Sequence, residues 1–405
     1  MTTASKPAVM SRDERLVLSI AVLASFVAFL DGTIVTIALP AIERDLGGGL
    51  ATQQWAVDAY LITLGALILL AGSLSDAYGR LLVMRIGLIG FGLTSIAIAG
   101  APNPEVLIIA RVFQGIAGAL LVPSSLALIM STFRGAASAR AIGIWTAMTT
   151  IALVAGPLIG GMFVDFASWR FAFLINVVPI VVTLVLIVRL GHHDVRRVGA
   201  SIDWLGAVLC TVGLGGTVFA LIEQPRLGWT SPLILVPLVV GVLSFAGFLV
   251  RQRLARDPMM PFSLFRVRNF WSGNLATTFI YGALSLNGFV LGVYLQEGAG
   301  LPATLAGLAT LPTTIFMIAL SSRVGTLAGK WGPRMFMTVG PILMGIGSLL
   351  LLSVRSDFSY WTQVLPSVLI FSLGLTITVA PLTSAILGAI EPERSGIASA
   401  INNAI

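Results

Sequence analysis

Long runs of apolar residues follow one another along almost the whole chain, separated by short turns that carry glycine and charged residues. Each run holds about 20 residues or more, the length that a helix needs to cross the hydrocarbon core of a bilayer. A helix also satisfies its own backbone polar groups there, where water is absent. The pattern therefore predicts twelve membrane-spanning helices. They cover residues 16–42, 55–74, 81–101, 105–132, 139–166, 170–189, 203–223, 231–250, 272–297, 304–328, 333–353 and 359–389.

Two of the turns repeat one pattern. Gly72–Arg80 and, 253 residues later, Gly325–Gly332 both carry glycine at the first and eighth positions and leucine at the third. A second pair, Arg140 and Arg394, opens two apolar runs at an offset of 254 residues. Eight predicted spans separate the copies, an even number, so both copies face the same side of the membrane. Internal repeats of this kind are typical of secondary transporters.

The offset also predicts how the chain is divided. A parallel repeat of six spans would give an offset of about 200 residues, so the spans at 203–223 and 231–250 are interpreted as inserted between the halves. We expect a cytoplasmic tail (1–15), an N-terminal six-helix bundle (16–189), two inserted helices with their linkers (190–270) and a C-terminal bundle (271–405). A thirteenth apolar run begins at Ser395 and is too short to span by Ile405, so we expect the C-terminal bundle to be incomplete.

Composition agrees with an all-α polytopic membrane protein. Apolar residues make up 57% of the chain, charged residues 10%, and the mean hydropathy is +0.98, values that exclude a soluble domain. The net charge of +7 comes from basic residues grouped between apolar runs, which indicates membrane topology and argues against nucleic-acid binding. Cys210 is the single cysteine, so no disulfide and no cysteine-based metal site is expected. The first apolar run is long enough to span and has no small-residue cleavage site, so we expect no removable signal peptide.

Lysine and arginine predict the orientation. With the N-terminus in the cytoplasm, nineteen of the 24 basic residues fall inside, four fall outside, and Arg111 lies within a span. Short loops obey the positive-inside rule, so this bias predicts a cytoplasmic N-terminus.

Five segments resemble motifs of one transporter family. Leu30–Pro40 resembles a first-helix motif of aspartate followed by Ala-Leu-Pro, and Gly72–Arg80 a loop between the second and third helices. Arg111–Ala119 resembles a fourth-helix motif, Gly156–Gly161 a fifth-helix antiporter motif, and Trp169–Asn176 the start of a sixth helix. Together they resemble the major facilitator superfamily, and within it the fourteen-span drug:proton antiporters.

The chain departs from that family pattern at a few positions. Ala77 and Leu81 stand where the loop motif usually carries basic residues, and Ala117 and Ala152 stand where the fourth and fifth helices usually carry glycine. The fold prediction is unaffected. The two loop positions bear on which charges pair at the cytoplasmic gate.

The resemblance implies a major facilitator fold and an exporter of small amphipathic or cationic compounds such as drugs, antiseptics or secondary metabolites. Export would be driven by protons entering a bacterial cell across its cytoplasmic membrane. A facilitator or proton symporter of a small metabolite with the same fold is the alternative. We expect no enzyme activity, no cofactor and no metal, because the sequence carries no phosphate-binding loop and no nucleophile with a paired base. The expected partners are a small-molecule substrate, protons and the lipid bilayer, with the chain as a monomer.

Asp31 and Arg111 are the candidates for proton coupling. An ionised carboxylate inside a span must face water, a partner or the bundle interior, and desolvation there favours its protonated form. Arg111 cannot deprotonate, so it needs an acid or carbonyl oxygens, and Asp31 is the natural partner. Two plainer interpretations stay open: Asp31 caps a helix break near Gly32 and Pro40, and Arg111 extends to the outer surface near Glu105.

Other polar and aromatic residues in the spans are candidates for a substrate cavity. Asp58 could attract a cationic substrate or take a second proton, or it could be an interfacial charge beside Trp55. Glu223 and Glu297 end their spans on the outside, and we expect both to be solvated. The remaining substrate-binding candidates are Tyr60, Gln114, Trp145, Asn176, Tyr281 and Asn287.

Two further groups of residues are predicted to serve the conformational change. Gly72, Asp76, Gly79 and Arg80 form a candidate cytoplasmic gate, and a solvated loop is the alternative. In the fifth span, glycines at near four-residue spacing leave one face without side chains and let another helix approach, while a proline permits a bend. The resemblance implies that this helix lies at the interface between the halves, where a smooth surface lets them move; ordinary small-residue packing is the alternative. The residues are Gly156, Pro157, Gly160 and Gly161.

Overall fold

The computed structural model describes residues 10–191, 202–256, 258–354 and 358–390, together with residues 398, 401 and 402. Every regular element in these ranges is helical. The helices are α1 (Arg12–Leu46), α2 (Gly49–Tyr78), α3 (Arg80–Ala99), α4 (Pro104–Ala119), α5 (Val122–Thr132), α6 (Gly135–Phe166), α7 (Trp169–Leu174), α8 (Val177–Leu190), α9 (Trp204–Leu227), α10 (Pro232–Leu254), η1 (Leu264–Arg266), α11 (Arg268–Val293), η2 (Tyr294–Gly298), α12 (Ala303–Ala309), α13 (Leu311–Trp331), α14 (Pro333–Leu350), η3 (Leu351–Ser353), η4 (Tyr360–Val364) and α15 (Leu365–Leu387).

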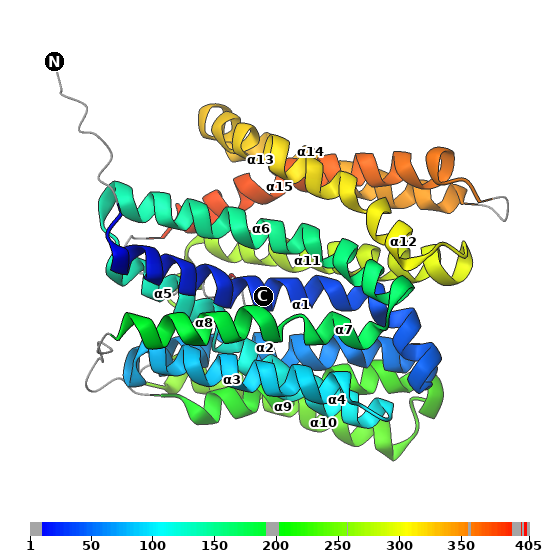
Figure 1. Ribbon diagram of the computed structural model, residues 1–405, viewed down its shortest axis with the longest axis horizontal. Helices are drawn as coiled ribbons and strands as arrows, with labels where there is room; N and C mark the ends of the chain where they lie inside the picture. The colour runs from blue at the N-terminus through cyan, green and yellow to red at the C-terminus, as the bar shows by residue number, and fades with distance from the viewer. Residues whose placement is uncertain are drawn as a thin grey trace.

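Twelve helical stretches in the described residues are long and apolar enough to cross a membrane, and they match the predicted spans one for one. The run predicted from Ser395 lies almost entirely outside the described residues. The long helices lie side by side in one slab (Figure 1), with the pair α9 and α10 at one edge and α13, α14 and α15 at the opposite edge. Between these edges α1 lies between α6 and α8 and packs against both.

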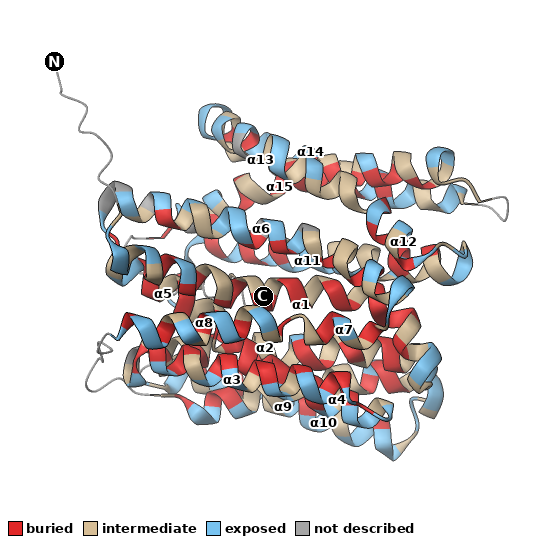
Figure 2. Cartoon of the chain, viewed as in Figure 1, coloured by how far each residue is buried: buried red, intermediate tan, exposed pale blue. Residues whose placement is uncertain are grey.

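Burial follows this arrangement. Most of α1 is buried, because small residues such as Ala21, Ala24 and Ala28 let neighbouring helices approach from several sides. The outward face of α10 is exposed instead (Figure 2), and its exposed side chains, among them Val236 and Leu243, are apolar. An exposed apolar face on a helix of this length is what a lipid environment requires.

Three predicted spans are interrupted by a break between two α-helices. The fourth breaks at Leu120 and Leu121 between α4 and α5, and the tenth breaks at Thr310 between α12 and α13. In both cases the following helix carries proline in its first turn, where the missing N–H is tolerated. The sixth breaks at Ile175 and Asn176 between α7 and α8, and Pro179 removes the N–H that would bond to the Ile175 carbonyl in a continuous helix.

The two repeated turns have the same local structure. Gly79 separates α2 from α3 with a φ of 106°, and Gly332 separates α13 from α14 with a φ of 83°. Side chains rarely adopt such angles, which explains glycine at the eighth position of the repeat. The first position is different, because a Cβ at Gly72 would meet no atom within 4 Å and one at Gly325 would meet only Ala380. The prediction of a repeated turn is confirmed, and only its second glycine is required by the backbone.

The inserted helices α9 and α10 form a hairpin that docks on α2. Gly213 lies against Phe245 and Gly216 against Gly241, so the two backbones approach closely. On the predicted cytoplasmic side, Asp203 accepts hydrogen bonds from Arg251 Nε (2.6 Å) and Gln252 Nε2 (2.9 Å), which joins the start of α9 to the end of α10.

The expectation for Glu223 is wrong. Its side chain is 10% exposed, and it accepts hydrogen bonds from Trp55 Nε1 (2.9 Å) and from the Arg226 guanidinium, which ties α9 to α2 at the opposite end of the hairpin. Trp55 also packs against Phe219 of α9, with 5.8 Å between the ring centroids. Glu297 is exposed, as expected, although it accepts a hydrogen bond from Gln53.

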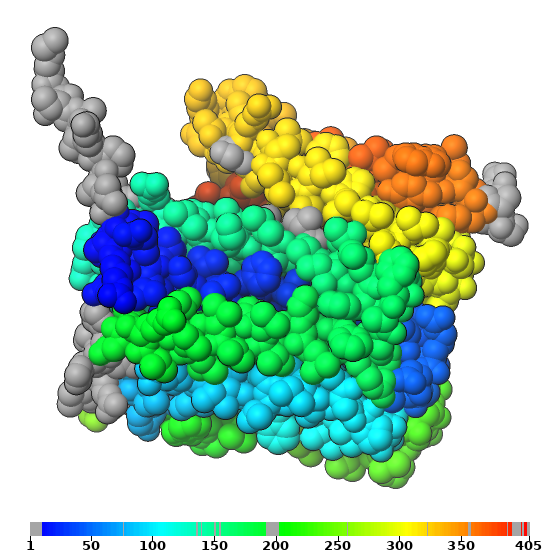
Figure 3. Space-filling view, in the orientation of Figure 1, coloured from blue at the N-terminus to red at the C-terminus, as the bar shows by residue number. Residues whose placement is uncertain are grey.

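Contact between α6 and the helices of the C-terminal half is concentrated at one end of the slab. There α12 packs extensively against α6, whereas α13 touches α6 at few points. The surface is accordingly hollowed between α6 and α13 and closed where α12 meets α6 (Figure 3). The closed end carries the α1–α2 and α3–α4 turns, which the basic-residue pattern places outside the cell.

Candidate functional site

Asp31 and Arg111 form a buried ion pair. Asp31 lies near the middle of α1 and Arg111 on α4, both side chains have 0% exposure, and Arg111 Nη1 donates to Asp31 Oδ2 at 2.5 Å. The pairing predicted from the sequence is therefore direct. Arg111 does not reach the outer surface. Every hydrogen-bond partner of the Asp31 carboxylate in the described residues is a side chain of another segment, so Asp31 does not cap a helix break.

Two buried amides complete the shell around the carboxylate. Asp31 Oδ1 accepts from Gln114 Nε2 (3.1 Å) and from Asn176 Nδ2 (2.9 Å). The Gln114 amide also accepts from Arg111 Nη1 (2.7 Å) and donates to Ser95 Oγ (3.0 Å). Gln114, Asn176 and Ser95 each have 0% exposure. Five side chains from α1, α3, α4 and the α7–α8 break thus form one network that is closed to solvent.

Aromatic rings and a backbone carbonyl hold the guanidinium. Arg111 Cζ lies 4.4 Å from the centroid of the Tyr60 ring and 5.9 Å from that of Phe173. Its Nε donates to the Ala56 carbonyl at 2.6 Å, while Nη2 has no partner in the described structure. Cation–π contacts and charge-assisted hydrogen bonds of this kind offset part of the penalty for burying a charge.

This arrangement can couple a proton to a structural change. A buried ion pair is tolerable as a unit, whereas removing one charge leaves the other uncompensated at a penalty of about 3–5 kcal/mol. Protonation of Asp31 removes the negative charge of the pair and leaves the positive charge of Arg111 uncompensated. The network must then rearrange, or Arg111 must find another partner.

The other substrate-binding candidates separate into two groups. Tyr60, Gln114 and Asn176 belong to the buried network around Asp31, and their role toward a substrate stays a prediction. Trp145 lies on α6, donates to Ser25 Oγ at 2.9 Å and packs edge-on against Phe29. Tyr281 and Asn287 lie together on α11, where Tyr281 is exposed and Asn287 donates to Ser348 of α14.

Asp58 is half-buried on α2, one helical turn beyond Trp55. In the described residues its carboxylate has no hydrogen-bond or ion-pair partner. Trp55 itself donates to Glu223, and both interpretations of Asp58, a substrate-attracting or proton-binding acid and an interfacial charge, stay predictions.

Sequence reasoning missed three members of the site: Ser95, Phe173 and the carbonyl of Ala56. Ser95 was visible as a hydroxyl inside the third span, and Phe173 lies in the sixth-helix motif three residues before Asn176. Nothing in the sequence singles out the Ala56 carbonyl, because its role depends only on where α2 and α4 cross.

The small residues of α6 face two different neighbours. A Cβ at Gly156 would overlap Thr33, and one at Gly160 would approach Ile34, so both glycines let α1 pack closely beside Asp31. A Cβ at Gly161 would instead meet Ala303 and Thr304 of α12. The implied position of this helix between the halves is confirmed by its packing against α12, and of these three glycines Gly161 faces the other half while Gly156 and Gly160 face α1.

Pro157 lies within α6 on the side that meets α12. Its backbone carbonyl lies against Gly307 of α12, so position 307 has no room for a side chain. Pro157 and Gly161 thus both contribute to the contact between α6 and α12.

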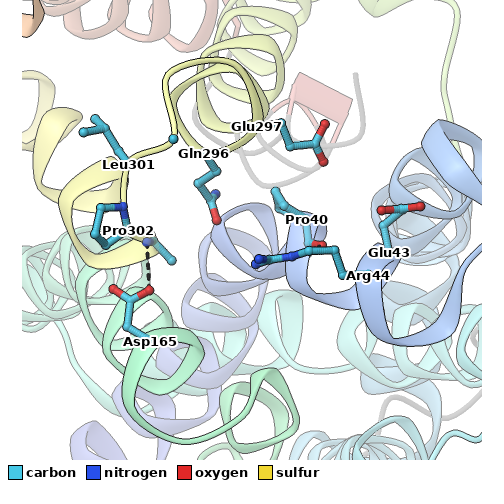
Figure 4. A pocket seen from close by; sticks show the side chains of 10 residues that line it. Pro40, Glu43, Arg44, Asp165, Gln296, Glu297, Leu301 and Pro302 are labelled. Carbon is cyan, nitrogen blue, oxygen red and sulfur yellow. Dashed lines mark hydrogen bonds between the residues drawn. The ribbon is translucent and has the colours of Figure 1, made fainter.

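A polar vestibule lies at the closed end between the halves. It is a hollow of about 600 Å³ lined mainly by Glu43, Arg44, Asp165, Gln296, Glu297 and Pro302. Figure 4 shows Asp165 pointing at the chain beside Pro302, where its carboxylate accepts from the backbone N–H groups of Ala303 (2.9 Å) and Thr304 (2.7 Å).

Two more hydrogen bonds join the halves near this vestibule. Gln296 Nε2 donates to the Ile37 carbonyl at 3.1 Å, and Gln53 Nε2 donates to Glu297 at 2.8 Å. Together with the Asp165 contact they form the outer latch, a set of three cross-half contacts made by Asp165, Gln296 and Gln53.

The candidate cytoplasmic gate lies at the α2–α3 turn. Gly72 lies on α2, Gly79 forms the turn and Arg80 begins α3. The side chain of Asp76 lies outside what the structure describes, so its pairing with Arg80 stays a prediction. In the described part of the chain no three His, Cys, Asp or Glu residues form a group that could hold a metal ion, and His192 and His193 lie outside that part.

Taken together, twelve spanning helices around a buried ion pair define a multi-pass membrane transporter fold. Residues 21–405 match the family model of the Major Facilitator Superfamily, and the chain belongs to that family. It is a transporter and not an enzyme.

Several of its relatives are resistance proteins. The chain is 33% identical over 392 residues to the methylenomycin A resistance protein of Bacillus subtilis, covering 96% of this chain and 83% of that protein. It is 34% identical over 400 residues to the multidrug resistance protein Stp of Mycobacterium tuberculosis, covering 98% and 73%. Identity to the puromycin resistance protein pur8 of Streptomyces alboniger is 32%, covering 94% and 76%.

Solved structures share the fold. A peptide transporter POT in complex with sulfate gives a TM-score of 0.67 at 14% identity, covering 96% of this chain and 87% of that one. The inward open xylose transporter XylE from E. coli gives 0.63 at 14% identity, covering 96% and 86%. At such identities the likeness shows the fold alone.

Proposed function

We propose that this chain exports small amphipathic or cationic compounds in exchange for protons, by alternating access across a bacterial cytoplasmic membrane. The observation that carries the proposal is the solvent-free Asp31–Arg111 pair with its two amide partners. The names of the relatives support the export of antibiotics and other drugs. We further propose a monomer that uses the proton gradient alone, with no cofactor.

The proton acts first at Asp31. Its uptake cancels the charge that balances Arg111, and the guanidinium is left without a charged partner, beside the Ala56 carbonyl, the Gln114 amide and the Tyr60 and Phe173 rings. The attraction between α1 and α4 falls, and α1 is free to shift. Release of the proton restores the pair.

A shift of α1 is transmitted through α6. Gly156 and Gly160 hold α6 directly against Thr33 and Ile34, two to three residues from Asp31, and Gly161 holds the same helix against α12 of the other half. Tightly packed helices move as units, because a close-packed interface allows few intermediate positions. A change at Asp31 is therefore carried to the contact between the halves.

The structure corresponds to a form closed at the outer latch and opening between α6 and α13 (Figure 3). With the N-terminus in the cytoplasm, as the basic residues predict, this form would load substrate from the cell interior. Asp58, half-buried and without a partner in the described residues, is the candidate for attracting a cationic substrate.

The proton gradient is sufficient for resistance. At 100 mV and one pH unit, one proton exchanged for a neutral compound supplies about 2.3 plus about 1.4 kcal/mol, enough for an outward gradient of several hundredfold. One-for-one exchange with a monovalent cation moves no net charge, so the pH difference alone drives it, about tenfold per pH unit, and each further proton adds the full amount.

The test is accumulation of ethidium, a lipophilic cation, in cells that express the full-length gene and lack their own drug pumps. Wild type should lower accumulation, an uncoupler should abolish the difference, and Asp31→Asn should behave like the empty vector at every external pH. Export that survives the uncoupler would favour the facilitator alternative. Undiminished export by Asp31→Asn, at equal expression, would remove Asp31 from the proposed mechanism.

A further inference from the structure

Every partner of the Asp31 carboxylate in the described structure donates a hydrogen. Arg111 Nη1 donates to Oδ2, and the amide nitrogens of Gln114 and Asn176 donate to Oδ1. This pattern fits an ionised carboxylate, which only accepts. A protonated carboxyl carries an O–H that must itself find an acceptor. Proton uptake therefore requires one of these partners to reverse.

Oxygen Oδ2 cannot hold the proton while Arg111 stays in place. The guanidinium has five donors and no acceptor, it does not deprotonate in proteins, and its Nη1 lies 2.5 Å from Oδ2. A hydrogen on Oδ2 would face this donor. The proton is therefore held at Oδ1, between the two amides.

Gln114 is fixed in its present orientation by two other contacts. Its Oε1 accepts from Arg111 Nη1 at 2.7 Å and its Nε2 donates to Ser95 Oγ at 3.0 Å. Reversal of this amide would turn the NH₂ group toward the guanidinium and place two donors face to face.

Asn176 is free of such constraints. Its Oδ1 is buried and has no hydrogen-bond partner in the described structure, and its Nδ2 contacts only Asp31 Oδ1 (2.9 Å) and, weakly, Ser95 Oγ (3.5 Å). A half-turn about the Cβ–Cγ bond exchanges the two ends of the amide and aims Oδ1 at Asp31. Among the described residues, the other charged or titratable groups facing Asp31 are Arg111 from α4 and Tyr60 from α2, whose hydroxyl donates to the Ala28 carbonyl. From α3, the Ser95 hydroxyl joins the network.

We propose that Asn176 is a positioning residue for the proton, whose amide donates to ionised Asp31 and, after a half-turn, accepts from protonated Asp31. The inference rests on the proposed function, in which Asp31 takes up the proton. The incoming proton forms an O–H bond at Asp31 Oδ1, and one N–H···O contact is replaced by one O–H···O contact. No covalent bond of Asn176 breaks.

The reversal is tested by infrared difference spectroscopy of the purified full-length protein in lipid, between alkaline and acidic buffer. Wild type should gain a carboxylic acid band that is absent from Asp31→Asn. With the same pH midpoint, an amide carbonyl band should move to lower frequency. This shift should be missing from Asn176→Leu, because leucine has a volume similar to that of asparagine and its side chain has no polar atoms. Thr183→Val is the matched control, since Thr183 is buried further along α8 and, within the described part of the chain, its hydroxyl donates to the Pro179 carbonyl of its own helix; it should keep both bands.

A transport profile separates this role from a merely structural one. If the amide serves both protonation states, Asn176→Leu should lower the maximal rate of proton-driven export about tenfold while the pH midpoint moves by less than about half a unit. If the amide only donates to the carboxylate, its loss favours protonated Asp31 and moves the midpoint to higher pH by about one unit with the rate kept.

Each outcome decides between the two ideas. A carboxylic band in wild type without an amide change that depends on Asn176 would overturn the reversal and leave the proton site standing. No Asp31 band at any pH would overturn the proton site of the proposed function itself. If Asn176→Leu does not fold, Asn176→Ser also removes the amide band from the difference spectrum. Serine is smaller than asparagine and keeps a hydrogen-bonding group, so this variant is expected to fold.

Discussion

Arg111 is held by a ring as well as by a charge. Tyr60 lies 4.4 Å from the guanidinium carbon, and its hydroxyl donates over a long 3.4 Å to the Ala28 carbonyl. The ring therefore contributes more to the site than the hydroxyl does. When Asp31 is protonated, the ring face still attracts Arg111, together with the Ala56 carbonyl and the Gln114 amide oxygen.

We expect Tyr60→Phe to keep ethidium export within about twofold of wild type and Tyr60→Leu to lower it about tenfold, since a cation–π contact in a desolvated site contributes roughly 2 kcal/mol. The measurement is the initial rate of ethidium efflux from cells with equal amounts of each variant. Equal rates for Phe and Leu at position 60 would mean that the ring does not support Arg111.

Arginine and lysine are not equivalent at position 111. Arg111 uses Nε for the Ala56 carbonyl and Nη1 for both Asp31 and Gln114, which one ammonium group cannot reach together. We predict that Arg111→Lys lowers proton-driven export at least about tenfold while the folded protein is still recovered, as checked by a monodisperse elution profile in detergent. Near-normal export would show that a positive charge alone is enough at this position.

At the scale of the helices, the contact between α1 and α6 explains why glycine occurs at particular positions. A Cβ at Gly156 would overlap the Thr33 side chain, while a Cβ at Gly143 on the same helix would meet no atom within 4 Å. Both glycines lie inside the same predicted span, and they differ in whether a neighbouring helix packs against them.

Gly156→Ala should therefore reduce export at least about fivefold by forcing α1 and α6 apart, since overpacking of a close contact is destabilising by about 1–3 kcal/mol. Gly143→Ala is the control on the same helix and should be tolerated. Efflux rates and thermal unfolding of both variants, measured side by side, check the prediction. A harmless Gly156→Ala would mean that this contact is looser than the structure indicates.

The hairpin of α9 and α10 depends on one ionised side chain at its base. Burial alone would raise the pKa of Asp203, but hydrogen bonds from Arg251, the Gly206 N–H and Gln252 outweigh it and hold the pKa below its ordinary value of 3.8. A carboxyl with a lowered folded-state pKa adds stability above its unfolded value and loses it as the pH falls through the folded value.

We predict that Asp203→Asn lowers the melting temperature at pH 7 and that the difference from wild type begins to shrink below about pH 4, where the carboxyl of the unfolded chain takes up its proton before that of the folded protein does. Thermal unfolding in detergent across this pH range is the measurement. A difference that stays constant with pH would assign the effect to shape and not to charge.

For the whole molecule, the outer latch decides which side is closed. Asp165 accepts from two backbone N–H groups of α12, and no other carboxylate in the described residues bridges the halves in this way. Its loss would leave two donors at the start of α12 without their partner.

Asp165→Ala should shift the population toward outward opening, by about tenfold in the equilibrium if the two bonds together contribute roughly 1–3 kcal/mol. Spin labels at positions 166 and 305, whose native side chains are exposed at the outer ends of α6 and α12, would report longer distances. Glu105→Gln, an exposed acid of α4 outside the vestibule, should leave the distances unchanged. Identical distances in Asp165→Ala and wild type would contradict a latch.

The sequence by itself determined the membrane class, the twelve spans, the repeated turn and the pairing of Asp31 with Arg111. These follow from local rules: apolar length decides whether a helix spans, and a buried acid and base without water must find each other.

Only the tertiary structure decided which polar residues join that pair. Gln114 and Asn176, predicted to bind substrate, bond to Asp31 because the fourth span and the break of the sixth converge on α1. Glu223 is buried and not solvated because the inserted hairpin docks on Trp55, and Gly156 faces α1 and not the other half. Each of these facts depends on which helix lies opposite, and helix periodicity reports the face of a residue but not its neighbour across the interface.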